Sequence, residues 1–108
     1  MKALKLAEKL NLNIYNSGED REITAVYCCD LLSVVMGRGK ADSAWVTVMG
    51  NINSAAVAVL VDIGVIVLAE NTKPDENLLN KAKDENLTIL GSGEPIFETA
   101  LKIYEELK

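Results

Sequence analysis

The chain has 108 residues, of which 49 % are hydrophobic and 25 % charged, and its formal net charge is −5. This length supports one hydrophobic core, so we expect a single domain over residues 1–108. The negative charge disfavours nucleic-acid binding, which needs a basic face. No apolar run reaches the roughly 18 to 20 residues of a membrane span, and residues 1–10 lack the apolar centre of a signal peptide, so we expect a cytoplasmic protein with no membrane partner.

The residue types present restrict the chemistry that we expect. The chain contains no histidine, which is the commonest general base and metal ligand. Its two cysteines are adjacent, Cys28 and Cys29, and so do not have the spacing of a redox or zinc motif. We expect one or both to pack as small apolar residues on a strand, in preference to acting as a catalytic thiol. The sequence therefore predicts no catalytic residue, no metal and no cofactor.

The first half of the chain predicts a short amphipathic helix over 2–10 and strands over 12–15 and 23–28. Asp30 is suited to cap a helix over 31–36, because its carboxylate can accept from exposed backbone N–H groups. That explanation is simpler than a ligand-facing role for Asp30 and Ser33. The glycines in 37–42 then favour a loop.

The second half alternates regularly between strands and helices. We expect strands over 44–49, 65–68 and 87–90, and helices over 53–63, 75–85 and 95–107. Pro74 and Pro95 stand where the first helical residue is expected, a position that tolerates a missing N–H. This alternation predicts an α/β fold whose sheet is mainly parallel, with right-handed crossovers.

Ligands of such sheets bind beyond the carboxyl ends of the strands, where we expect the loops 50–53, 70–73 and 91–94 to meet. The start of helix 53–63 also offers backbone N–H groups to an anion. The candidate ligand residues are Thr47, Gly50, Asn51, Asn53, Ser54, Glu70 and Asn71. A tight turn and a helix cap, with Asn53 and Ser54 as the cap, explain several of them equally well and are the simpler interpretation.

Helix 53–63 is apolar on nearly every side, which is typical of a helix buried on both faces. In so small a domain we expect a partner chain to cover one of those faces, and therefore a homodimer. Asp62, near the end of this helix, is expected to face solvent and to have no functional role.

Two segments, Arg21–Met36 and Trp45–Val59 continued by Gly64–Leu68, resemble the DRTGG domain family. The resemblance covers nearly the whole chain and implies a three-layer α/β/α fold similar to the N-terminal domain of HPr kinase/phosphorylase. Related domains lie beside CBS domains in regulated pyrophosphatases and often pair as dimers. In one pyrophosphatase they help to hold an adenine nucleotide compound.

The motif that names the family is altered here. Gly50-Asn51-Ile52 stands where members show Gly-Asp-Arg, and Ala69-Glu70-Asn71 stands where they show Thr-Gly-Gly. The arginine that could pair with a phosphate is therefore replaced, and Glu70 adds a negative charge. Some members carry a serine-kinase label, but this chain has no G-x-x-x-x-G-K-[ST] loop, and we interpret 37–40 as a helix stop and a turn.

We therefore expect a non-catalytic regulatory module that senses a nucleotide or another phosphate-containing small molecule as a homodimer. The alternative is a structural or protein-docking subunit of a larger assembly. A kinase-related enzyme fragment ranks below both, because the sequence supplies no recognisable base, phosphate-binding cation and metal site.

Overall fold

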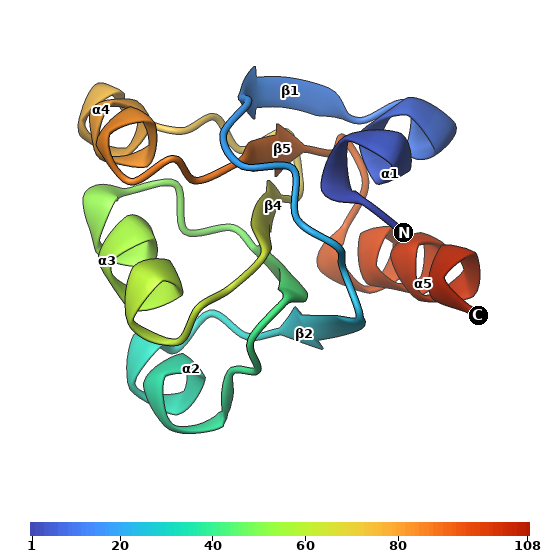
Figure 1. Ribbon diagram of the computed structural model, residues 1–108, viewed down its shortest axis with the longest axis horizontal. Helices are drawn as coiled ribbons and strands as arrows, with labels where there is room; N and C mark the ends of the chain where they lie inside the picture. The colour runs from blue at the N-terminus through green and yellow to red at the C-terminus, as the bar shows by residue number, and fades with distance from the viewer.

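The computed structural model describes residues 1–108 as a five-stranded sheet between two layers of helices (Figure 1). The elements in chain order are α1 (Ala3–Leu10), β1 (Asn13–Asn16), β2 (Ala25–Cys28), α2 (Leu32–Arg38), β3 (Ser43–Thr47), α3 (Ile52–Leu60), β4 (Val65–Leu68), α4 (Glu76–Asp84), β5 (Ile89–Gly91) and α5 (Ile96–Leu107). The predicted three-layer α/β/α fold with a mainly parallel sheet is confirmed. No helix has both the length and the apolar character needed to cross a membrane.

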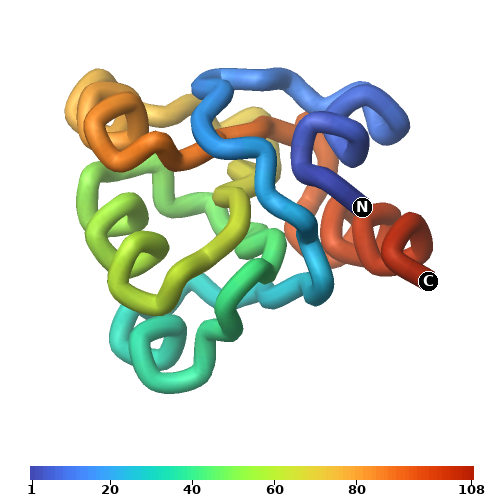
Figure 2. The backbone as a smooth tube through the Cα atoms, viewed as in Figure 1, coloured from blue at the N-terminus to red at the C-terminus, as the bar shows by residue number.

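The strands lie in the order β1-β5-β4-β3-β2. The strands β2 to β5 are parallel, and β1 joins the far edge antiparallel to β5. Because each parallel strand lies beside the next one in the chain, right-handed crossovers place α2, α3 and α4 on one face. The helices α1 and α5 cover the other face, where both chain termini also lie (Figure 2).

Alternate strand residues divide the core between these two faces. The cluster under α2, α3 and α4 takes Trp45, Ile66, Leu68 and Ile89 from the strands. The cluster under α1 and α5 takes Ala44, Val46, Val65, Val67 and Leu90. Every residue of β3, β4 and β5 is buried, which explains why these strands are largely apolar and do not alternate between apolar and polar residues.

Several element ends differ from the sequence-based expectation. The third strand ends at Thr47, and α3 ends at Leu60, before Asp62 turns the chain at a φ of 61°. The prediction that Pro74 and Pro95 begin helices is wrong. Asp75 is the cap of α4, with its carboxylate accepting from the Leu78 N–H at 2.8 Å, so Pro74 lies outside the helix, and Pro95 itself takes the cap position of α5.

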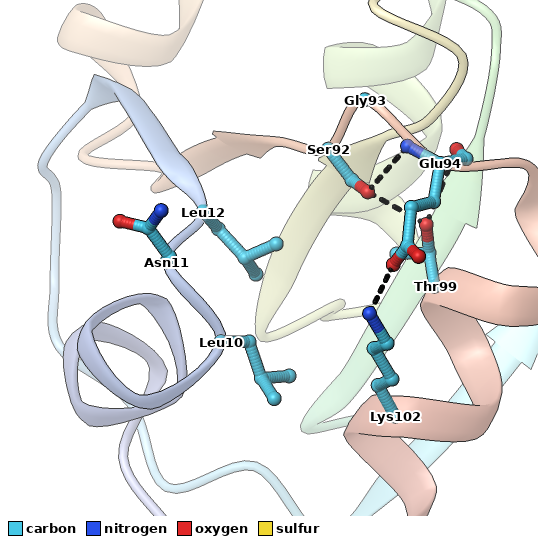
Figure 3. A pocket seen from close by; sticks show the side chains of 8 residues that line it. All are labelled: Leu10, Asn11, Leu12, Ser92, Gly93, Glu94, Thr99 and Lys102. Carbon is cyan, nitrogen blue, oxygen red and sulfur yellow. Dashed lines mark hydrogen bonds and ion pairs between the residues drawn. The ribbon is translucent and has the colours of Figure 1, made fainter.

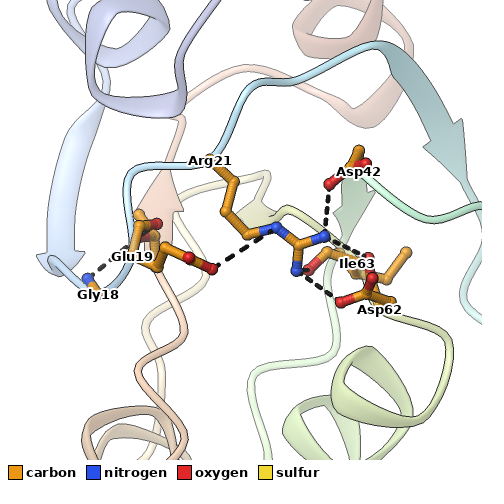
Figure 4. Close-up of polar contacts among 7 residues, drawn as sticks. Gly18, Glu19, Arg21, Asp42, Asp62 and Ile63 are labelled. Carbon is orange, nitrogen blue, oxygen red and sulfur yellow. Dashed lines mark hydrogen bonds and ion pairs between the residues drawn. The ribbon is translucent and has the colours of Figure 1, made fainter.

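The segment between β1 and β2 crosses the amino edge of the sheet and is held there by Arg21 (Figure 4). The guanidinium donates to the carboxylate of Asp62 at 2.8 Å, to that of Asp42, and to the carbonyl oxygens of Asp62 and Ile63 at 3.2 Å each. The hydrogen bond to Asp62 raises the pKa of Arg21, against the opposing effect of burial. The Asp62 side chain is 67 % exposed, as expected, but it has this structural partner.

Candidate functional site

The four parallel strands end at one edge of the sheet, and the loops that follow β3, β4 and β5 lie there side by side. The Gly50 carbonyl accepts from the Asp75 N–H at 2.8 Å, which joins the first loop to the second. The Asn71 N–H donates to the Ser92 carbonyl at 2.9 Å, which joins the second to the third. The expected meeting of these three loops is therefore confirmed.

Gly50 is required by the close approach of the two central loops. A Cβ atom built on Gly50 would lie 2.7 Å from the Lys73 carbonyl oxygen and 3.2 Å from the Thr72 side chain. Backbone groups on both sides hold this spacing, so a side chain at position 50 would push the loops apart. The structure thus gives Gly50 a packing role that needs no ligand.

The start of α3 is capped by Asn51, whose side-chain oxygen accepts from the Asn53 N–H at 2.9 Å. The Ser54 N–H donates to the Asn51 carbonyl at 3.1 Å, and the Ser54 hydroxyl donates to Met49 at 2.5 Å. The prediction that Asn53 and Ser54 form the cap is therefore wrong, because the helix begins one residue earlier than expected. Two of the first-turn N–H groups expected to hold an anion already have partners within the chain.

Thr47 and Asp30 form a contact between the ends of β2 and β3. The buried Thr47 hydroxyl donates to the Asp30 carboxylate at 2.6 Å, and the Val48 N–H donates to the same oxygen at 3.1 Å. The prediction that Asp30 caps α2 is wrong, because Leu31 takes the cap position and no side chain caps this helix. Asp30 therefore joins the ends of β2 and β3 and does not cap the helix that follows it.

Glu70 and Asn71 lie at the point where the sheet changes sides. The loop after β4 leads to α4 on one face, and the loop after β5 leads to α5 on the other, an arrangement that usually opens a ligand crevice. Here the Glu70 N–H donates to the Glu94 carbonyl at 2.9 Å, beside the bond from Asn71 to Ser92. Both side chains are exposed, but these backbone bonds close the crevice beneath them.

A cavity of about 230 Å³ lies next to this closed crevice, on the α1 and α5 face (Figure 3). The loop residues Ser92, Gly93 and Glu94 form one side of it, Thr99 and Lys102 of α5 form another, and residues 10–12 at the end of α1 complete it. None of the seven predicted ligand residues lines this or another cavity.

The polar groups of this cavity are organised by the start of α5. The buried hydroxyls of Ser92 and Thr99 lie 2.8 Å apart, and the Glu94 N–H donates to Ser92 at 3.1 Å. Lys102 reaches back to the Glu94 carboxylate at 2.7 Å. Both charged side chains are about half exposed, at 52 % and 45 %, so the ammonium group of Lys102 can be reached from solvent.

Sequence reasoning identified the loop 91–94 but missed Lys102 and the end of α1. Lys102 lies two helical turns beyond Glu94, outside the range of the usual pairs on one helix face. Asn11 comes from a segment more than eighty residues earlier in the chain. Only the packing of α1 and α5 on the same face of the sheet brings these groups together.

The two cysteines pack in different ways. Cys29 lies against the cluster beneath α2, α3 and α4. Cys28 ends β2 and is exposed, and the partial burial of its thiol, then Asp30 and Cys29, raise the pKa of that thiol. No group of three or more Asp, Glu, Cys or His side chains is placed to hold a metal ion.

No family model and no curated protein matches the sequence. The chain is similar in structure to the CBS and DRTGG domains of the regulatory region of Clostridium perfringens pyrophosphatase, determined in complex with the activator diadenosine tetraphosphate. The TM-score is 0.76 at 12 % sequence identity, over 94 % of this chain and 45 % of that chain. The chain therefore has a DRTGG-like fold and spans less than half the length of that neighbour.

Proposed function

We propose that this chain is a regulatory module that senses a small phosphate-containing molecule, with a nucleotide as the best candidate, and that it performs no covalent chemistry. The observation that carries the proposal is the DRTGG-like fold, since the neighbour with this fold belongs to a regulatory region complexed with an activator nucleotide. Fold alone does not determine function. The case for a binding site therefore depends on the residues at the edge of the sheet that the carboxyl ends of the parallel strands form.

Two parts of that edge are candidates for the ligand. The region at the carboxyl ends of β3 and β4 contains the seven residues predicted from the sequence, but its loops pack against each other and hold no cavity. These residues are Thr47, Gly50, Asn51, Asn53, Ser54, Glu70 and Asn71. The neighbouring cavity has room and one accessible cation, Lys102. A phosphate group that replaced Glu94 as the partner of Lys102 would gain a charge-assisted hydrogen bond. We therefore favour the cavity.

A binding experiment tests the proposal. Thermal shift and calorimetry would compare adenosine with ATP, diadenosine tetraphosphate and inorganic phosphate. Ligand at a hundredfold excess over its dissociation constant stabilises a protein by about 2.7 kcal/mol, so we expect a rise of several degrees with a nucleotide and none with adenosine. A flat response to all of them would contradict the proposal, and release of phosphate from ATP would indicate an enzyme.

Two exposed positions distinguish the two sites. Lys102→Gln removes the cation of the cavity, while Asn53→Asp adds a repelling charge at the start of α3, where a carboxylate is also compatible with the helix dipole. We expect Lys102→Gln to weaken nucleotide binding by tenfold or more and Asn53→Asp to leave it unchanged. The reverse result would place the ligand at the predicted loops.

A second function, a docking subunit, is favoured by a different observation. Several large apolar side chains remain exposed on the single chain, among them Leu60, Phe97 and Tyr104. A partner protein or a second copy would cover them. The homodimer expected from the sequence as part of the ligand-sensing module would use such a surface as well. Absence of any ligand response together with stable self-association would favour it.

A further inference from the structure

One side of the molecule combines an open sheet edge with an exposed apolar helix face. The strand β2 has β3 as its only neighbour, so its outer edge has no strand partner. It contains no charge, proline or bulge, the devices that usually protect such an edge. The opposite edge strand, β1, is irregular, with a register shift between Ile14 and Asn16. The unprotected edge is therefore the one beside α5.

Two hollows lie between β2 and α5. The first, of about 280 Å³, is lined only by apolar residues, among them Cys28, Phe97 and Leu101. The second, of about 270 Å³, adjoins Thr24, Leu107 and Lys108. Val26 and Tyr104 line both. The helix thus runs antiparallel to the strand, with the middle of its exposed face level with the middle of β2.

The exposed face of α5 has a residue spacing that allows two copies of the helix to pack against each other. Phe97, Leu101, Tyr104 and Lys108 follow one another at helical spacing and form a single stripe. If two copies of α5 pack antiparallel, Phe97 lies level with Lys108 of the partner subunit, and Leu101 lies level with Tyr104 of the partner subunit. A single two-fold axis outside β2, level with its middle and between the two edge strands, then relates both the strands and the helices, as an isologous interface requires.

We propose that this face binds a second copy of the chain, with Phe97 of each protomer filling the hollow beside Leu107 of the other. Phe97 is 69 % exposed, and no other residue of its own chain fills that hollow. The charges also fit this arrangement. Glu98, an acidic residue at the start of α5, meets Lys108 at the end of the partner's helix.

This interface differs from the one expected from the sequence, which used α3. The outer residues of α3, among them Leu60 at 67 % exposed, are equally apolar. They line no hollow and adjoin no open sheet edge. The proposal does not depend on ligand binding, so its failure and that of the proposed function are separate results.

Sedimentation velocity of the full chain and two matched variants tests the interface. Phe97→Glu and Leu60→Glu make the same change at positions of nearly equal exposure, 69 % and 67 %. Because a buried interface aromatic is typical of a binding hot spot, we expect Phe97→Glu to raise the dimer dissociation constant by about thirtyfold or more. Leu60→Glu should leave it unchanged. Circular dichroism and urea unfolding would check that both variants fold.

A charge exchange tests the antiparallel arrangement. Glu98→Lys and Lys108→Glu should each weaken the dimer, and the double variant should restore it. A monomeric wild-type chain would overturn the proposal, as would dissociation caused by Leu60→Glu and not by Phe97→Glu. Additive weakening in the double variant would overturn the antiparallel pairing of α5.

Discussion

Glu70 and Asn71 are adjacent residues in the left-handed backbone region, with φ values of 59° and 58°. A residue with a Cβ atom meets a penalty of about 1 to 2 kcal/mol there, less for Asn than for Glu. The DRTGG motif has two glycines at the corresponding positions, and glycine adopts this φ freely. The altered motif therefore changes the backbone energy of the loop as well as its charge.

At this position we predict that Glu70→Gly stabilises the protein. Relief of the left-handed conformation outweighs the extra freedom that glycine gives the unfolded chain, so the free energy of unfolding should rise by about 0.5 to 1 kcal/mol. Urea unfolding would measure it. As a control, Glu98→Gly in the helical first turn of α5 should lower that free energy by about 1 kcal/mol. A loss of stability in Glu70→Gly would contradict the strain.

At the scale of the element, the start of α3 shows which residue organises a strand–helix junction. Asn51 closes the helix end with its side chain, and Gly50 allows the neighbouring loop to pack against it. Asn53 contributes its backbone N–H to the cap, while its side chain is exposed. The junction therefore depends on the first asparagine and not on the second.

The prediction for this element is that Asn51→Ala lowers the free energy of unfolding by about 1 kcal/mol, the usual cost of losing an N-cap. Asn53→Ala should be neutral or slightly stabilising, because alanine is the better helix former. Thermal or urea unfolding of both variants makes the comparison. An equal or larger loss at Asn53 would show that the cap lies where the sequence placed it.

The elements that could be predicted are those whose signal is local. The strand β4 is a continuous apolar run, β3 and β5 are largely apolar, and helices alternate with them, so their parallel direction follows from the sequence. Asp30 was misplaced because its strongest partner, Thr47, is seventeen residues away. The sequence predicted only the 91–94 loop of the cavity for the same reason. Lys102 and Asn11 come together through the packing of α1 and α5, and no local sequence pattern indicates this.

At the scale of the whole molecule, Arg21 holds together segments from three parts of the chain. It joins the connection between β1 and β2 to Asp42 before β3 and to Asp62 before β4. Glu19, in the same connection, accepts from the Thr88 hydroxyl at 3.0 Å, just before β5. One irregular segment thus connects the starts of β3, β4 and β5 along the amino edge of the sheet.

Because Arg21 makes these contacts with Asp42 and Asp62, we predict that Arg21→Met lowers the free energy of unfolding by about 1 to 2 kcal/mol. Hydrogen bonds to charged groups are worth more than this when buried, but water can solvate the two exposed carboxylates that lose their partner. Arg38→Met, at the exposed end of α2, should change it by less than about 0.5 kcal/mol. Equal stability of the two variants in urea would contradict the role of Arg21.

The position of β1 also sets an order in time. Each parallel strand finds its neighbour in the next one along the chain, but Asn13 of β1 lies opposite Gly91 of β5. A ribosome makes the chain from its amino end, so β1 is the first of the five strands to be synthesised and its partner β5 is the last. The strand β1 therefore leaves the ribosome well before the strand that it pairs with, and it cannot join the sheet until β5 has been made.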